Sequence, residues 1–258
     1  MPMVPAAENI SFRNELLRAL PADELQRLRP HLAPVTLVVS QVLQEADAPI
    51  EEVFFLESGL AFLTADTRDH GLVEVGTTGR DGFVGLAVLL SSEPFSVHRA
   101  FVQIPGRAYR LRATVFREMA EALPTLRDRC LRYVQVMLMQ NSQIAACNAR
   151  HELPGRLARW LLMSRDRIDG NDLPMTQEFL SAMLGVRRAG ISVVANALQG
   201  QGLIRQSRGR ITVLDRAGLE GKACTCYRMI EHNRARIMGT TRTADAPPGP
   251  EFGTRRSS

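Results

Sequence analysis

The chain has 258 residues, of which 45% are hydrophobic and 23% charged, as in water-soluble proteins of one large or two ordinary domains. No apolar run approaches the ~20 residues that cross a bilayer, and the first residues lack the basic start and apolar core of a secretion signal. Four scattered cysteines fit a reducing compartment better than a disulfide scaffold. We therefore expect a cytoplasmic protein with no membrane partner.

Charge is unevenly distributed along the chain. Residues 1–149 contain 14 arginines and 17 acidic residues, whereas residues 150–216 contain 11 arginines and 6 acidic residues. A slightly acidic first part followed by a basic second part indicates that the second part binds a polyanion.

Residues 1–122 are predicted to form a domain of short strands preceded by a helix. Leucines recur at helical spacing over 10–33, interrupted by Pro21, and the pattern then changes to short segments separated by glycines. Strands are expected at 36–39, 53–56, 60–64, 72–75, 100–104 and 108–111. Because no βαβ alternation appears, this spacing favours an antiparallel sandwich or barrel.

A short helix is expected at 114–122, followed by a long one within residues 123–150 that begins at Pro124. The long helix has two neighbouring apolar stripes: Leu126, Cys130, Tyr133, Met137 and Ile144, and then Leu131, Val134, Leu138 and Ala145. A helix packed only on its own domain needs one stripe, so two stripes indicate a second contact, with another copy of the chain. The alternative is a single wide stripe buried within a monomer.

Residues 151–218 predict a winged helix-turn-helix domain. An amphipathic helix at 151–168, with Leu157, Trp160, Leu161 and Leu162 on its buried side, precedes two shorter helices. The first begins at Thr176, whose hydroxyl can cap it, and ends at Gly185. The second follows Val186, and its tight connection to the first is the helix-turn-helix layout. Arg208-Gly209-Arg210 then forms the turn of a two-stranded wing.

Over 174–213 the charges are five arginines and one acid, Glu178. A positive face on a helix of groove width suits double-stranded DNA. The alternative is a winged helix that contacts only protein.

Residues 219–240 are expected to be a helical extension, running as a short helix to about Ile237, and residues 241–258 a disordered tail rich in Pro, Gly, Ser and Thr. The extension carries Cys224 and Cys226. A tetrahedral metal site needs four ligands, and Cys130 and Cys147 lie on the long helix without CxxC spacing. We therefore expect inert or packing thiols, no metal site and no cofactor; the alternative is a redox or metal pair at Cys224 and Cys226.

Taken in order, the strand domain, long helix and winged helix resemble the Crp/Fnr family of bacterial transcription regulators over about residues 12–218. The DNA-binding part of the resemblance rests on LPMTQEFLSAMLGVRRxxIS and QGLIRQSRGRITV, and the sensor part on VFFLESG and GRDGFVG. It implies an α+β fold: an N-terminal antiparallel β-roll of the cyclic-nucleotide-binding type, a long dimerisation helix and a C-terminal winged helix-turn-helix. It further implies a homodimer on a two-fold symmetric operator, RNA polymerase as a partner, and a small-molecule effector held by the β-roll.

The chain departs from this family at the effector site. Cyclic-nucleotide binders place an acid just after an F-x-G turn and an Arg-Ser/Thr pair about ten residues on. Here Leu86 follows the turn and cannot accept a ribose hydrogen bond, and a buried phosphate without its arginine is costly. Cyclic AMP is therefore not expected, although a shifted loop could supply a cation from His98 or Arg99. Arg80, His98 and Arg99 are the candidate effector-binding residues; the alternative for 98–99 is a solvated turn.

The resemblance also indicates which residues read DNA. Arg187 and Arg188 begin the second helix, where arginine commonly pairs with guanine. The full set is Thr176, Gln177, Arg187, Arg188, Ser192, Asn196, Arg208 and Arg210, with the first two and the last two expected on phosphates. Ala189 stands where the family commonly has an acid and Val193 where it often has arginine, so a different operator is expected. No catalytic residue is expected, because the chain has no phosphate loop, metal-ligand spacing or nucleophile elbow.

Overall fold

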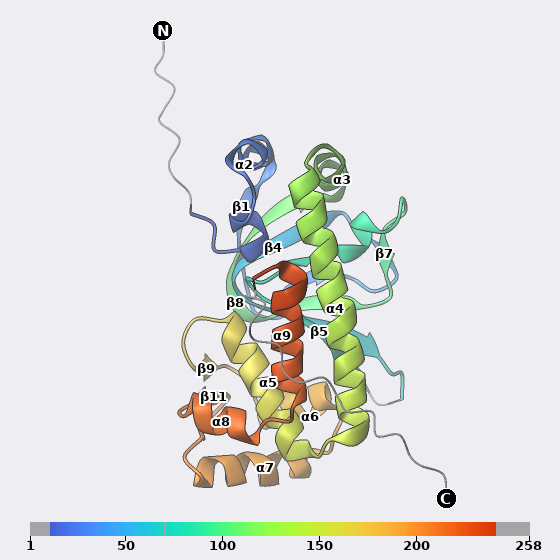
Figure 1. Ribbon diagram of the computed structural model, residues 1–258. Helices are drawn as coiled ribbons and strands as arrows, with labels where there is room; N and C mark the ends of the chain where they lie inside the picture. The colour runs from blue at the N-terminus through green and yellow to red at the C-terminus, as the bar shows by residue number, and fades with distance from the viewer. Residues whose placement is uncertain (1–10, 70, 241–258) are drawn as a thin grey trace, which may run out of the picture.

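The computed structural model describes residues 11–69 and 71–240. It has the predicted α+β fold, in which a β-roll and a winged helix-turn-helix lie on the same side of one long helix (Figure 1). The predicted tail, residues 241–258, lies outside the described ranges. No helix within those ranges is both long and apolar enough to cross a membrane.

Two short helices and a 3₁₀ turn open the described part of the chain: α1 (Glu15–Arg18), α2 (Ala22–Leu28) and η1 (Arg29–His31). The buried side chain of Asn14 caps α1 by accepting hydrogen bonds from the backbone N–H groups of Leu16 and Leu17. Pro21 separates α1 from α2, as the sequence indicated, because proline is compatible with a helix start and not with its interior.

The β-roll is entirely antiparallel. Its main sheet has the order β1-β8-β4-β5, with β2 paired to β8 and β6 paired to β4, and β3 pairs with β7 separately. The strands are β1 (Ala33–Leu37), β2 (Val42–Gln44), β3 (Ala48–Pro49), β4 (Glu52–Asp66), β5 (Leu72–Thr78), β6 (Phe83–Val84), β7 (Phe95–Ser96) and β8 (Arg99–Arg112), with the 3₁₀ helix η2 (Leu86–Leu89) between β6 and β7.

The prediction of separate strands at 53–56 and 60–64 was wrong, since both belong to the single strand β4, and the two strands predicted over 100–111 are likewise one, β8. Gly59 marks an irregularity in the pairing of β4 with β8 instead of a turn. Its φ is +84°, and a Cβ there would lie 2.5 Å from the carbonyl oxygen of Ile104. Glycine therefore lets the strand bend without ending.

Helix α4 (Pro124–Arg150) runs beside both modules and follows the short helix α3 (Ala113–Ala122). Its first predicted stripe packs on the β-roll as far as Met137, and Ile144 packs against the core of the winged-helix module. The ring of Tyr133 lies so close to Gly82 that a Cβ on Gly82 would be 1.9 Å from Cζ of the ring. The second stripe is open at its centre, where Leu138 is 66% exposed.

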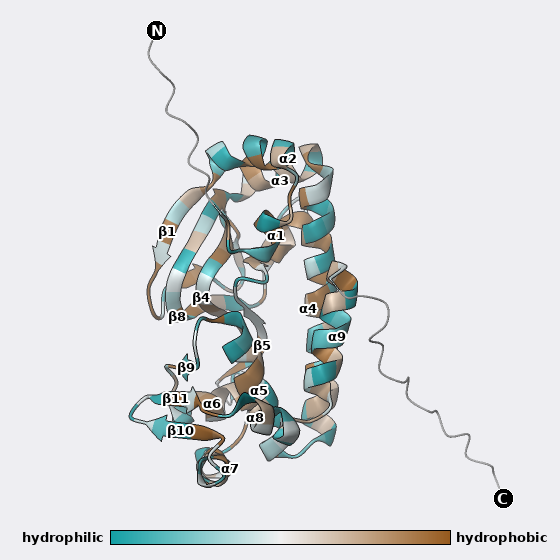
Figure 2. Ribbon diagram, turned by 60° about the vertical axis from the view of Figure 1, so that its left-hand side comes forward, coloured by the Kyte–Doolittle hydropathy of each residue, from teal (hydrophilic) through white to brown (hydrophobic). Residues whose placement is uncertain are grey.

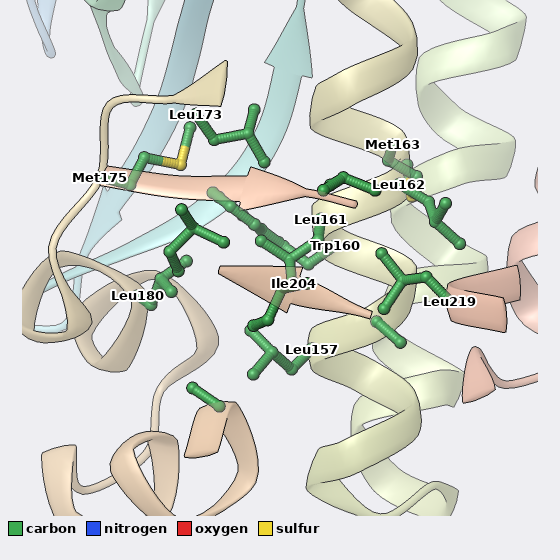
Figure 3. Packing of buried hydrophobic residues seen from close by; sticks show 14 of the residues in the cluster. Leu157, Trp160, Leu161, Leu162, Met163, Leu173, Met175, Leu180, Ile204 and Leu219 are labelled. Carbon is green, nitrogen blue, oxygen red and sulfur yellow. The ribbon is translucent and has the colours of Figure 1, made fainter. Parts of the chain in front are cut away.

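The winged helix-turn-helix consists of α5 (Leu153–Arg167), β9 (Asp172–Leu173), α6 (Gln177–Leu184), α7 (Arg188–Gly200), β10 (Ile204–Ser207) and β11 (Arg210–Val213). Strands β10, β11 and β9 form a small antiparallel sheet. The predicted buried side of α5 is confirmed: Leu157, Trp160, Leu161 and Leu162 pack with side chains from α6 and β10 (Figure 3).

The C-terminal extension forms two helices, α8 (Arg216–Lys222) and α9 (Cys226–Met238). The single helix predicted there was wrong, because the chain leaves helical geometry at Ala223 (ψ 144°). Helix α9 then runs antiparallel to α4 and packs along it (Figure 2). The Arg129 guanidinium donates to the carbonyl oxygen of Met238 (2.8 Å). Arg234 pairs with Glu15 of α1 (3.1 Å), so α9 contacts the first helix as well as the long one.

The two modules share a hydrophobic core. Phe62 of the β-roll stacks on Phe179 of α6 and packs against Trp160 of α5. A buried ion pair lies nearby, between Arg167 of α5 and Asp81 (3.0 Å), and Arg167 also donates to the side-chain oxygen of Gln140 on α4 (2.9 Å). The orientation of the winged helix against the β-roll is therefore fixed by apolar and charged contacts together.

Candidate nucleic-acid interface

Local sequence explains the sharp turn between α6 and α7. The Thr176 hydroxyl accepts a hydrogen bond from the backbone N–H of Phe179 (3.0 Å), which caps α6 as predicted. Gly185 ends that helix with φ +62°, a left-handed conformation that glycine adopts without strain. Helix α7 then begins at Arg188, with Arg187 at its N-cap position.

One open cleft of about 550 Å³ lies between the start of α6, the start of α7 and the wing. It gathers five of the eight predicted DNA-binding residues, namely Thr176, Gln177, Arg188, Arg208 and Arg210. Three of these are arginines and one other lining residue, Glu178, is acidic. The cleft is therefore open to an anionic ligand that approaches from solvent.

The outer face of α7 continues from this cleft. Arg188, Ser192 and Asn196 follow one another at four-residue spacing, which places them on one side of a helix, and Ala189 and Val193 lie beside them. Arg187, Arg188 and Asn196 are exposed, and Ser192 is half-buried. Val193 is 70% exposed, an unusual position for a branched apolar side chain. The face thus offers cationic, polar and apolar groups in a single row.

Three of the predicted DNA contacts, Gln177, Ser192 and Asn196, are hydrogen-bonded within the protein. Ser192 Oγ donates to Gln177 Oε1 (2.5 Å), and Gln177 Nε2 donates to Gln206 Oε1 (2.5 Å). Gln206 in turn donates to Asn196 Oδ1 (3.0 Å). This chain of hydrogen bonds joins α6, α7 and β10. Gln206 was not predicted, because its contacts with α6 and α7 depend on the register of β10 with β11.

The two wing arginines differ in their surroundings. Arg210 forms an ion pair with Asp172 of β9 (2.7 Å), whose other carboxylate oxygen accepts a hydrogen bond from the Thr212 hydroxyl (2.7 Å). The Thr212 hydroxyl and the Arg210 charge together hold the pKa of Asp172 below its usual range. Arg208 is exposed and has no ion pair in the part of the chain that the structure describes. The charge of Arg208 is therefore more available to an anionic ligand than the charge of Arg210, which Asp172 compensates.

The three candidate effector residues are not brought together. Arg80 lies at the junction with α5, where it pairs with Asp169 (3.1 Å) and donates to the carbonyl oxygen of Asp166. Arg99 pairs with Glu45 (3.2 Å) in the β-roll. The carbonyl oxygen of His98 accepts a hydrogen bond from Gln44. A single anion site made from all three is therefore not formed in this structure, since Arg80 is directed to the other module.

The sequence spacing alone gave no reason to group Cys147 with the cysteine pair of the extension. Because α9 folds back along α4, the ligand atoms of Cys147, His151, Cys224 and Cys226 all lie within 4.8 Å of one another. The spacing Cys-x₃-His on a helix was the signal that could have predicted this, since it places both side chains on one face.

The fold and this cationic helix define a winged helix-turn-helix protein with an N-terminal β-roll. Residues 155–221 match the family model of the Crp-like helix-turn-helix domain. None of the curated protein sequences matches the chain.

Three solved structures share the fold across both modules. A Crp/Fnr-family protein from Eubacterium rectale is 17% identical, with a TM-score of 0.62, over 83% of this chain and 98% of that one. A CRP-family transcriptional regulator from Thermus thermophilus is 19% identical, with a TM-score of 0.61, over 73% of this chain and 96% of that one.

The third structure is CLP of Xanthomonas campestris, described as a c-di-GMP responsive global regulator. It is 15% identical, with a TM-score of 0.61, over 76% of this chain and 100% of that one. The resemblance to the Crp/Fnr family is thus confirmed, by sequence over the helix-turn-helix and by fold over the rest. The relatives named here are transcriptional regulators, not enzymes.

Proposed function

We propose that the chain is a sequence-specific transcription regulator of the Crp/Fnr type that acts in the cytoplasm. Helix α7 enters the major groove with Arg187 and Arg188 at its leading end, while Arg208 on the wing and the start of α6 contact phosphates. The observation that carries this proposal is the cleft between α6, α7 and the wing, which gathers Arg188, Arg208 and Arg210 at the protein surface.

The proposed base-reading surface is the outer row of α7. Arg188 is placed to form a bidentate pair with guanine, and the exposed Val193 to contact a thymine methyl group. Ser192 and Gln177 support the row, because their hydrogen bond holds α6 and α7 together. Arg210 contributes less than Arg208, because Asp172 already compensates its charge.

A homodimer is the proposed active form. Leu131, Leu138 and Ala145 recur every seven residues on α4, which aligns them in one stripe, and Leu138 is 66% exposed. Helix α9 does not cover this stripe, since its hydrogen bonds to α4 come from Arg129, Arg132 and Gln143 on another face. A second copy of α4 is therefore the proposed occupant, which would place two α7 helices in successive major grooves about 34 Å apart. Contact with RNA polymerase is part of the same proposal.

Cyclic AMP is not the proposed effector. Leu86 occupies the position of the ribose-binding acid, and the Tyr133 ring fills the space directly over Gly82. If an effector exists, His98 and Arg99 on the rim of the β-roll are the proposed contacts, and Arg80 is proposed to act at the junction between the modules.

The decisive experiment is selection of genomic fragments by the purified full-length protein, followed by gel-shift titration against the selected and random duplexes. Specific binding, stronger to selected than to random fragments, is expected. Equal and weak retention of all duplexes would overturn the proposal and favour the second candidate, a small-molecule sensor that works through protein contacts.

A further inference from the structure

We propose that Cys147, His151, Cys224 and Cys226 form a tetrahedral Cys₃His site for a zinc(II) ion. Three thiol sulfurs and one imidazole nitrogen are a common ligand set of structural zinc sites. All four ligand atoms lie within 4.8 Å of one another, and the four cysteines of the chain are free thiols. The site is separate from the DNA-binding cleft and does not depend on it.

The distances suit a single metal ion better than a disulfide. Zinc bonds of about 2.3 Å to sulfur and about 2.0 Å to nitrogen separate two tetrahedral sulfurs by about 3.8 Å and a sulfur from a nitrogen by about 3.5 Å. Here Cys226 Sγ lies 3.4 Å from His151 Nδ1, and Cys147 Sγ lies 3.3 Å from Cys224 Sγ. The second distance needs only a few tenths of an ångström of expansion, whereas a disulfide requires about 2.05 Å.

Two local features hold the ligands in place. Cys147 and His151 are four residues apart at the C-terminal end of α4, so they project from the same face. Cys224 and Cys226 flank the start of α9, and the backbone N–H of Cys224 donates to the carbonyl oxygen of Gly155 in α5 (3.3 Å). Three segments of the chain thus meet at the site before any ion binds.

The surroundings supply charge that the ligand set requires. Zinc with three thiolates and one neutral imidazole carries a net charge of −1, which needs a nearby cation when it is removed from water. Arg159 of α5 is 1% exposed and forms no ion pair within the described ranges, where Glu74 acts on it only at longer range. It donates a hydrogen bond to the sulfur of Met163 (3.5 Å), and its Nε has no partner among the described residues.

Arg159 also acts electrostatically on Cys147. Its positive charge favours the thiolate form of that side chain over the neutral thiol. When the thiols are neutral, the buried guanidinium next to them has no counter-charge at hydrogen-bonding distance, which is unfavourable for the cation. It becomes a matched pair when a metal converts the thiols into an anionic centre.

The ion would join the C-terminal extension to the hinge that carries the DNA-binding module. His151 is the residue between α4 and the N-cap of α5, so a metal bound there fixes the exit of α4. Arg156, one turn later, donates to Asn148 of α4 and to the carbonyl oxygen of Leu184 at the end of α6 (2.7 Å). The position of the helix-turn-helix is therefore mechanically connected to the site.

The test is the metal content of the full-length protein, purified under reducing conditions and measured by elemental mass spectrometry. About one zinc per chain is expected in the unaltered protein and in the control Cys130→Ala, whose sulfur lies in the β-roll core. Cys224→Ser, Cys226→Ser and His151→Asn should each lower zinc occupancy at least tenfold. Replacement by cobalt(II) should give the intense visible absorption of a tetrahedral thiolate complex.

A second measurement on the unaltered protein covers the case in which the variants do not fold. Thiol alkylation followed by mass spectrometry should show Cys147, Cys224 and Cys226 protected with zinc present and modified after chelation. The proposal is overturned by a metal-free protein with unprotected thiols, by a Cys147–Cys224 disulfide, or by bound iron with inorganic sulfide in place of zinc. None of these outcomes is itself a measurement of DNA binding, which is tested separately.

Discussion

The pair between Asp172 and Arg210 gives a quantitative prediction for DNA binding. Asp172→Asn removes the charge that holds Arg210 at 2.7 Å, while its amide oxygen can still accept the Thr212 hydrogen bond. Because Asp172 has a lowered pKa, it is ionised in the unaltered protein throughout the neutral range, so the substitution releases a full cation per subunit toward the DNA.

Each additional phosphate contact changes the slope of log K against log salt concentration by about 0.9. A dimer would gain two contacts, so the slope of the Asp172→Asn variant should be steeper by about 1.8. Between about 50 and about 200 mM salt, the affinity advantage of the variant should therefore shrink about twelvefold. Fluorescence anisotropy with a labelled selected duplex measures both quantities.

The double variant Asp172→Asn/Arg210→Ala is the matched control, because it removes the pair without changing net charge. Its slope should equal that of the unaltered protein. An unchanged slope in the single variant, or an equal increase in the double variant, would show that Arg210 does not reach phosphate and would refute the reasoning.

Three further predictions test the remaining parts of the proposal. Arg188→Ala should weaken binding to the selected duplex by ~1–3 kcal/mol and spare random duplexes more; equal losses in a competition gel shift would exclude base reading. Leu138→Glu should convert a dimer into monomers in analytical ultracentrifugation, because it places a charge in the apolar stripe, whereas a persistent dimer would locate the interface elsewhere. Burial raises the pKa of Glu74, which accepts hydrogen bonds from Thr77 and Trp160. Its contribution to stability is therefore full below the usual carboxyl pKa and is lost as pH rises through the raised value. Thermal melts should show Glu74→Gln more stable than the unaltered protein near neutral pH and no advantage in acid; a constant difference would contradict the assignment.

Sequence periodicity was sufficient to predict the elements that pack on their neighbours in the chain. The helix-turn-helix followed from the Thr176 cap, the Gly185 turn and the apolar positions between them, because these are local requirements of the backbone. The strand breaks predicted at Gly59 did not follow, because glycine serves bulges as well as turns and only the partner strand distinguishes them.

Contacts between segments distant in the sequence could not be predicted from periodicity. The return of α9 along α4 depends on the break after Lys222, and it alone brings Cys224 and Cys226 to Cys147. The engagement of Arg210 by Asp172 depends likewise on strand register within the small sheet. In each case the residue types were visible in the sequence, while their proximity was a property of the tertiary fold.

The reach of α9 from the end of α4 to Glu15 has a consequence for how the protein matures. Domains generally fold from the N-terminus during synthesis, whereas Tyr227 and Ile230 of α9 are buried in the core of the helix-turn-helix module. That core and the Arg234–Glu15 contact between α9 and α1 can be completed only after translation has passed α9. A newly made chain would therefore exist briefly with its DNA-binding helix translated but not yet secured.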